Sequence, residues 1–306
     1  MSSSCSSSGD VESQLLDVVV DSDSDSDSPP ARKVGRYNLE EPALGSGSYA
    51  SVYRATSMSM RSGDAVAVKV FRHADAGDCN CETRLFRFCD EIARTEIDVM
   101  RAVSRAQCSS LPRLIGVVRR SNSPHIRALV MPLYACGDLA SLIAHTGQCL
   151  TERVASRLIG ALARALAIVH AEGFVHHDVK PDNVFVRSVA DDGTLDVVLG
   201  DFGLAQRIGA WCSVAGGTAG YIPPEAQQKR AYIAVPSFDV WSLGVLLHVV
   251  LTMRLPTPVD EHLFDGKFSF GLVDVLCDML HVSATRRISL PRIQKHAWLS
   301  ITNLKA

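Results

Sequence analysis

The chain of 306 residues is 47% hydrophobic and carries 33 acidic and 31 basic side chains, for a net charge of −2. That length suits one large domain or two small ones. The charge balance gives no reason to expect a nucleic-acid partner. The N-terminus is polar without a secretory signal, and the longest apolar run, residues 240–253, is too short to span a bilayer. We therefore expect no membrane association, and an intracellular soluble protein of the cytoplasm, the nucleus or both.

The cysteines indicate a reducing environment. There are nine, an odd number without a paired Cys-x-x-Cys spacing, which favours free thiols over a disulfide framework. Cys79, Cys81 and Cys89 lie close together and could bind a metal ion. No fourth ligand stands at a suitable spacing, so metal binding is the weaker interpretation of this insert.

The first 30 residues contain seven acidic residues, a run of serines and no Lys or Arg. This composition cannot bury enough apolar surface to offset chain entropy, so residues 1–36 are predicted to be a disordered tail. With those seven acids set aside, 26 acidic residues face 31 basic ones in the rest of the chain. The tail is either a solvated segment, which composition favours, or an acidic arm that folds back on a basic domain.

Within the tail, Val18, Val19 and Val20 lie between Asp17 and an alternating run of Asp and Ser over residues 21–27. A short β-branched segment flanked by acids resembles a SUMO-interacting motif, which adds a strand to the edge of its partner's sheet. The resemblance implies SUMO as a partner, and phosphorylation of the serines would add negative charge. Such short motifs are also common by chance.

Residues 37–70 alternate in hydrophobicity as antiparallel strands do, with a turn at Gly45–Gly47. Small residues there let backbone N–H groups approach phosphates, although a Gly-Ser-Gly turn is more often only a hairpin. If residues 92–103 form a helix, Ile92 and Val103 belong to an apolar stripe that also contains Glu96. A lone acid on a buried face calls for a cation, and the alternative is a Glu at the helix edge that faces water.

Further along, residues 129–139 suggest a buried strand followed by a Gly-Asp turn. Residues 151–171 carry helical signals, with Thr151 as N-cap and Gly173 as the stop. Residues 197–199 then form a short buried strand before Asp201.

Four polar residues near this strand carry the chemistry of phosphoryl transfer. Asp178 can accept the proton of an attacking hydroxyl, and Lys180 can neutralise charge on the transferring phosphoryl group. Asn183 and Asp201 offer hard oxygen donors that suit Mg²⁺. Isolated polar residues in a loop are more often solvated surface groups, so the interpretation depends on further motifs in the right order.

Those motifs are Leu44–Val52, Val66–Lys69, Val175–Asn183, Gly200–Gly203, Gly217–Glu225 and Asp239–Gly244. In this order they resemble the conserved segments of eukaryotic serine/threonine protein kinases, over residues 37–301. The resemblance implies an α+β, two-lobed fold. A small, mainly antiparallel β lobe with one helix would occupy residues 37–133, and a larger helical lobe residues 134–301. The chain resembles compact, divergent members of the family, such as those of large DNA viruses.

The resemblance also implies roles for individual residues. The catalytic residues would be Asp178, Lys180 and Lys69, and Lys69 would pair with Glu96. The nucleotide would contact Gly45, Gly47, Val52, Ala67, Lys69, Glu96, Met131, Tyr134, Asp138 and Phe185. Asn183 and Asp201 would hold Mg²⁺, with ATP as co-substrate.

The acceptor is implied by Lys180 and by Thr218, which resemble the serine/threonine branch rather than the tyrosine branch. Asp138 and Asp182 fall where basophilic relatives place acids, which favours basic substrates. We expect a monomer that acts on protein Ser and Thr hydroxyls. Arg287 is the candidate partner of Glu225, as in the late buried ion pair of the family.

Some positions depart from the family pattern. Ala50 replaces the third glycine of the loop, and Pro132 replaces an acid but keeps its carbonyl. His177 replaces the arginine before the catalytic aspartate, and Val214 occupies the usual activating phosphosite, although Ser213 is adjacent. We therefore expect activity without activation-loop phosphorylation. The chain between residues 253 and 278 is shorter than usual, so the helical insert found there in relatives is expected to be trimmed.

Two alternatives remain open. A pseudokinase acting as a scaffold is disfavoured by the presence of Lys69, Asp178, Asn183 and Asp201. The departures from the family pattern at Ala50 and His177 keep this alternative open. A small-molecule kinase of similar fold is disfavoured by residues 218–225, a segment that shapes the peptide-binding surface in protein kinases.

Overall fold

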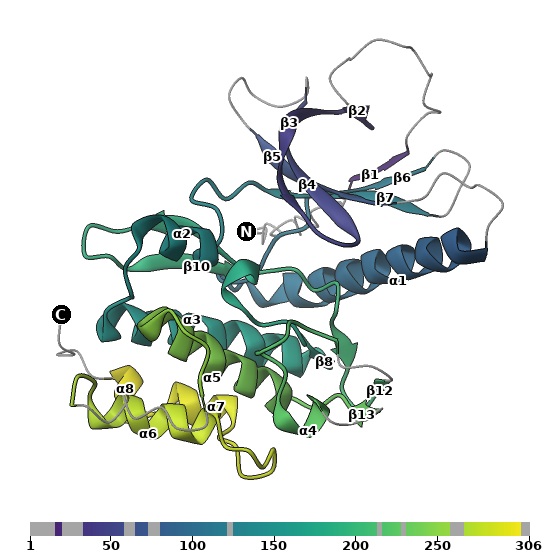
Figure 1. Cartoon of the computed structure of the whole chain (residues 1–306). Helices are drawn as coiled ribbons and strands as arrows, with labels where there is room; N and C mark the ends of the chain where they lie inside the picture. The colour runs from purple at the N-terminus through teal and green to yellow at the C-terminus, as the bar shows by residue number, and fades with distance from the viewer. Residues whose placement is uncertain are drawn as a thin grey trace, which may run out of the picture.

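The structure, a computed structural model, describes residues 16–19, 33–57, 65–72, 80–120, 125–212, 216–227, 231–257 and 266–300. The chain forms two lobes, a sheet with one long helix and a larger lobe of helices (Figure 1). The predicted two-lobed α+β fold is thereby confirmed.

The strands are β1 (Leu16–Val19), β2 (Lys33–Val34), β3 (Tyr37–Ser46), β4 (Ala50–Thr56), β5 (Val66–Phe71), β6 (Gly116–Arg119), β7 (Ile126–Pro132), β8 (Phe174–Val175), β9 (Val184–Val189), β10 (Leu195–Leu199), β11 (Gln206–Arg207), β12 (Trp211–Cys212) and β13 (Tyr232–Ile233). The helices are α1 (Asn80–Val103), α2 (Leu139–Thr146), α3 (Glu152–Ala171), α4 (Pro224–Gln227), α5 (Ser237–Thr252), α6 (Phe270–Met279), α7 (Leu290–Gln294) and α8 (Ala297–Ser300), with 3₁₀ turns at Ser104–Ala106 and Pro181–Asn183.

The small lobe is a seven-stranded sheet in the order β1-β6-β7-β5-β4-β3-β2. All of its pairings are antiparallel except the outermost one, where β1 runs parallel to β6. One face of the sheet has its own core, which includes Tyr37, Tyr53 and Val68. The other face packs on α1, whose buried side chains join the large core that continues into the second lobe. The sheet and α1 are therefore one packed unit above the helical lobe (Figure 1).

Within the predicted tail, Leu16–Val19 pair with β6 as β1. Two boundaries in this lobe differ from the expectation. Apart from β1, the sheet begins with β2 at Lys33 rather than at residue 37, because Val34 is fully buried and extends the apolar alternation. Helix α1 begins at Asn80, well before residue 92, since the intervening insert contains no Gly or Pro to stop it.

The helical lobe is built around α3 and α5. Thr151 caps α3 as predicted, its side chain accepting a hydrogen bond from the Val154 N–H at 3.4 Å. Among the described residues only α3 is long and apolar enough to cross a bilayer, and most of its apolar stretch is buried. It packs against α5, α7 and β10, as a core helix does. Between α5 and α6 the described residues, 253–257 and 266–269, contain no helix.

Candidate active site

A buried aspartate on α5 sets the backbone of the loop that carries Asp178. Asp239 is fully buried, and its carboxylate accepts the N–H groups of His176 at 2.8 Å and His177 at 2.9 Å. It also lies 2.7 Å from the Nε2 atom of His170 on α3. Burial alone would raise the pKa of Asp239, but the His170 hydrogen bond and the neighbouring histidines lower it. The two backbone hydrogen bonds to Asp239 hold the chain at His177, where φ is +68°, directly before Asp178.

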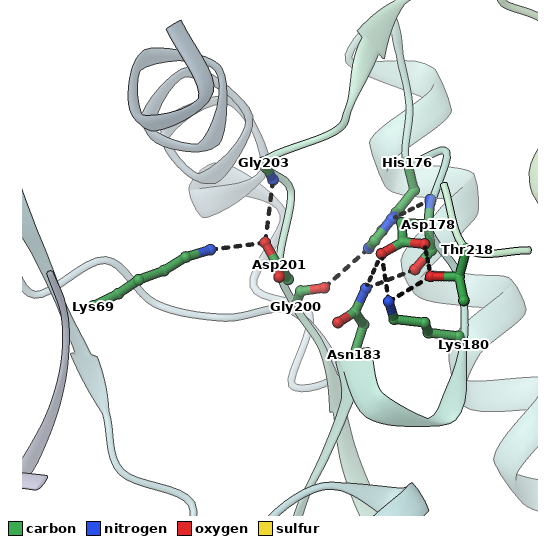
Figure 2. Close-up of polar contacts among 9 residues, drawn as sticks. All are labelled: Lys69, His176, Asp178, Lys180, Asn183, Gly200, Asp201, Gly203 and Thr218. Atoms are coloured by element: carbon green, nitrogen blue, oxygen red, sulfur yellow. Dashed lines mark hydrogen bonds and ion pairs between the residues drawn. The ribbon is translucent and has the colours of Figure 1, made fainter. Parts of the chain in front are cut away.

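The Asp178 carboxylate is held by three polar groups (Figure 2). Its Oδ1 atom accepts the Thr218 hydroxyl at 2.8 Å, and its Oδ2 atom lies 2.9 Å from both Asn183 Nδ2 and Lys180 Nζ. Lys180 also donates to the Thr218 hydroxyl oxygen at 2.5 Å. Thr218 reaches this position because Gly217 has φ +115°, and a Cβ there would lie 2.7 Å from the His177 carbonyl. The carboxylate is thus fixed in one orientation.

Asn183 and Asp201 are brought together by the β9–β10 hairpin. Leu199 pairs with Val184, and the Gly200 N–H donates to the Asn183 carbonyl at 2.9 Å. Asn183, just before β9, and Asp201, just after β10, therefore lie at the same end of the hairpin. Asn183 uses its amide nitrogen on Asp178, which leaves its oxygen on the side of Asp201 (Figure 2). One amide oxygen and one carboxylate are few protein donors, which suits Mg²⁺ because that ion takes the rest from water and phosphates. The residues present therefore fit this metal.

Lys69 on β5 joins the two lobes at the site. Its Nζ atom lies 2.8 Å from Glu96 Oε2 on α1 and 2.7 Å from Asp201 Oδ1. Burial alone would lower the pKa of Lys69, but the charges of Asp201 and Glu96 outweigh it and raise the pKa. Glu96 is 1% exposed, and its pKa is raised by burial against the opposing Lys69 charge, whereas Lys69 lowers that of Asp201. Glu96 is therefore a buried partner of Lys69 and does not lie at a helix edge that faces water.

His176, to which no role was assigned from the sequence, connects the two loops of the site. Its Nδ1 atom accepts the Asp178 N–H at 3.3 Å, so Nε2 carries the ring proton and donates to the Gly200 carbonyl at 3.0 Å (Figure 2). The ring is fully buried against Phe202, with centroids 4.8 Å apart. The one available signal was a histidine two residues before Asp178, where a side chain can bond the loop's own backbone.

The residues predicted to bind the nucleotide lie where the lobes meet. On the β4, β5 and β7 ladder, Val52 is opposite Lys69 and Ala67 is opposite Met131. Tyr134 stacks on Phe185 with ring centroids 5.7 Å apart, which joins the segment after β7 to β9. These contacts place the predicted pocket residues around the interlobe connection.

Asp138 has a structural function in addition to its predicted contact. Its Oδ1 atom accepts the Ser141 N–H at 2.7 Å and its Oδ2 atom accepts the Ser141 hydroxyl at 2.8 Å, so it is the N-cap of α2. Phe185 forms an isolated backbone bridge with the same residue. Any ribose or substrate contact by Asp138 would therefore share this carboxylate with the helix cap.

The glycine-rich loop does not need a third glycine in this conformation. Ala50 lies in β4, is 7% exposed and packs in the main core, and none of Gly45, Gly47 and Ala50 has a positive φ. The Gly47 N–H donates to the Ala50 carbonyl at 2.9 Å, which closes the turn. Alanine therefore causes no backbone strain there.

The structure describes only some of the cysteines and none of the predicted phosphosite positions. Ser213 and Val214 lie outside the described residues, as do Cys79 and the side chain of Cys81. Cys89 is buried, and no group of three or more His, Cys, Asp or Glu side chains in the described ranges could hold a metal ion. The six cysteines whose side chains are described are free thiols.

The predicted pair of Glu225 and Arg287 is present. The Nη1 and Nη2 atoms of Arg287 donate to the two carboxylate oxygens of Glu225 at 2.8 and 3.0 Å. The same guanidinium donates to the Ser237 and His281 carbonyls at 2.7 and 3.1 Å. This fork fastens the segment Gly217–Glu225, which the resemblance assigns to the end of a kinase activation segment, to the helical lobe.

Comparison with known proteins agrees with this geometry. A family model described as protein kinase domain matches residues 38–299. CBL-interacting protein kinase 4 of Oryza sativa subsp. japonica is 35% identical over 266 residues, which cover 85% of this chain and 50% of that protein. CBL-interacting protein kinase 16 of the same organism is 31% identical over 283 residues, with 87% and 57% covered.

A third similar protein is serine/threonine-protein kinase DCLK2 of Homo sapiens, 29% identical over 229 residues, which cover 69% of this chain and 29% of that protein. The chain thus spans about half the length of the two plant relatives and less of the human one. The family model matches far more than half of the chain, and the described residues form the two lobes. The chain belongs to the protein kinase family.

Proposed function

We propose that the protein is an active serine/threonine kinase that transfers the γ-phosphate of ATP to hydroxyl groups of protein substrates. The observation that carries this proposal is Lys69, which bonds Glu96 and Asp201 at once. A scaffold that had lost catalysis would have no need to place a cation from the small lobe on a metal-ligand candidate of the large lobe. The pseudokinase alternative is therefore the less supported one.

The chemistry follows from the groups around Asp178. The substrate hydroxyl oxygen attacks the γ-phosphorus, its proton passes to the Asp178 carboxylate, and the bond to the bridging oxygen of the leaving ADP breaks. Lys180, 2.9 Å from that carboxylate, offsets the negative charge on the transferring group. Mg²⁺ bound by Asn183 and Asp201 would neutralise phosphate charge. The protein contributes mainly positioning and electrostatics.

The acceptor class rests on Thr218. Its hydroxyl bonds both Asp178 and Lys180, which joins the loop Val175–Asn183 to the segment Gly217–Glu225. A basic substrate preference is supported by Asp182, an exposed carboxylate one residue before Asn183. It would pair with an arginine of the peptide. Replacing Asp182 with Asn should raise KM for arginine-containing peptides and leave KM for acidic peptides unchanged.

We further propose that the protein acts as a monomer in the cytoplasm or nucleus, and that the valine segment of the tail binds SUMO. Val18 and Val19 lie in β1, and Val20 lies outside the described residues. The segment has the β-branched composition that strand addition favours. Replacing the three valines with alanine should abolish binding to SUMO, and unchanged binding would refute this part.

The deciding experiment is transfer of labelled γ-phosphate from Mg·ATP to basic and acidic Ser/Thr peptides by the wild type and by Asp178→Asn. Because Asn cannot accept the proton, transfer should fall by at least about 10²-fold, while ATP binding stays within about threefold since Lys69, Asn183 and Asp201 are intact. Absence of transfer by both proteins, with ATP still bound, would instead favour the scaffold.

A further inference from the structure

A strand from the tail covers one edge of the small-lobe sheet. β1 pairs with β6 in parallel, with Leu16 opposite Gly116 and Val19 opposite Arg119. In the strand order β1 is outermost, so β6 would be the edge strand without it (Figure 1). An open edge presents unpaired N–H and C=O groups to any available strand. The tail therefore binds where a foreign peptide strand could bind.

The connection of β1 to the domain indicates a ligand on a tether rather than an integral strand. β1 and β2 lie at opposite edges of the sheet, and residues 20–32 join them. Six strand spacings of about 4.8 Å make a span of roughly 30 Å, and 13 residues reach at most about 45 Å. The link is long enough to let β1 leave, yet short enough to keep its effective concentration high.

The charges near the end of β6 also favour docking of the tail on this strand. The parallel register sends the chain out of β1 beside Arg119, with Arg120 next in sequence and Arg127 on the neighbouring strand β7. The sequence just beyond Val19 is the alternating run of aspartate and serine over residues 21–27. In sequence, the acidic run starts two residues after Val19, and its charge is opposite to that of the arginines near the end of β6. Phosphate groups on its serines would strengthen that attraction.

We propose that the outer edge of β6 is a peptide-binding edge with the segment Leu16–Val19 as its resident ligand in cis, and that the arginines at its end make docking tighter when the serines of the acidic run are phosphorylated. The inference does not depend on catalysis. β1 is outermost in the described strand order, so a partner's strand, that of SUMO included, would either add to its outer edge or displace the segment from β6.

Hydrogen exchange of the full-length chain tests the pairing. Val18→Pro removes a backbone N–H from the middle of β1 and disfavours the strand. We expect the β6 amides that face β1 to exchange at least about tenfold faster in this variant. Ser13→Pro, ahead of the strand, is the matched control and should leave β6 as in the wild type. Equal β6 protection in Val18→Pro and wild type, or equal loss in both variants, would overturn the proposal.

The charge component has its own test. The double variant Arg119→Gln, Arg120→Gln should raise β6 exchange in the full chain, and Lys295→Gln, at an exposed position in the helical lobe, should not. Chain phosphorylated at Ser22, Ser24 and Ser26 should exchange more slowly than unphosphorylated chain, and the difference should shrink as salt rises from about 50 to about 500 mM. Phosphorylation that leaves β6 exchange unchanged, or speeds it, would overturn this component.

Discussion

His177 lies nearly flat against Phe238, with ring centroids 4.4 Å apart and an angle of 22° between the planes. Tyr232 completes the cluster, with its hydroxyl 3.5 Å from His177 Nδ1, while Nε2 is buried with no hydrogen-bond partner in the described part of the chain. Burial, helped by the nearby His176 and opposed by Asp239, lowers the pKa of His177 to about 4. At neutral pH this position therefore carries no charge with which to bind a phosphate.

The first prediction concerns activation. Because His177 is neutral and buried, and because β12 pairs with β13, the described ends of the activation segment are held by packing and backbone pairing. Phosphatase-treated protein should keep at least about half of its peptide-kinase activity, since no phosphate–cation pair at this position would be lost. Activity of treated and untreated protein, with phosphate content measured by mass spectrometry, checks this. Near-complete loss on treatment would contradict it.

The second prediction is a pH dependence of stability. The His177 pKa is about 4 in the folded state and about 6.5 when unfolded, so between these values the unfolded chain binds more protons. The free energy of unfolding should therefore fall as pH drops from 6.5 to 4, by up to about 3 kcal/mol from this residue. Above pH 6.5 the residue should contribute no slope.

The comparison that isolates this effect is wild type against His177→Asn, because Asn tolerates the positive φ and does not titrate. Urea unfolding at several pH values should give a flatter profile for the variant between pH 6.5 and 4. His145→Asn, at an exposed site on α2, serves as control and should follow the wild type. Parallel profiles for wild type and His177→Asn would contradict the prediction, because they would mean that the histidine takes up its proton over the same pH range in the folded and unfolded states.

A third prediction concerns the buried ion pair. The Arg287 side chain is fully buried and that of Glu225 is 23% exposed, so Glu225→Gln leaves a buried guanidinium without its counter-charge. We expect a loss of about 2–4 kcal/mol in the free energy of unfolding. Arg153→Gln breaks an exposed pair with Asp192 and should cost less than about 1 kcal/mol. Similar costs for the two variants in urea unfolding would mean that the Glu225 pair is no more stabilising than a surface pair.

The spacing of polar residues carried most of the information about the site. Asp178, Lys180 and Asn183 fall in one short loop, so their proximity follows from sequence distance alone. Glu96 could be found because an acid on an apolar helix stripe needs a cation, and Lys69 supplies it. The roles assigned to these residues stay predictions, whereas their mutual contacts are features of the structure.

Other features depend on contacts between distant segments and leave little trace in local pattern. The partners of His177, at positions 232 and 238, come from β13 and α5, so the substitution suggested a missing cation but not an aromatic cluster. The β1 strand has only four residues within a polar tail, and its partner lies 100 positions away. A prediction from composition averages over the whole tail, so it does not detect four residues that pair with an open sheet edge.

The last prediction separates the hydroxyl of Thr218 from its methyl group. Thr218→Ala removes the donor to Asp178 and the acceptor for Lys180, so the carboxylate and the ammonium lose their common anchor. We expect kcat for a threonine peptide to fall about 10–100-fold, because misorientation of catalytic groups acts on the transition state. KM for ATP should change less than about threefold, since none of the predicted nucleotide contacts is altered. Thr218→Ser keeps both hydrogen bonds and should retain most of the wild-type kcat. If Ser failed as badly as Ala, packing of the methyl group, and not the hydrogen bonds to Asp178 and Lys180, would be what this position supplies.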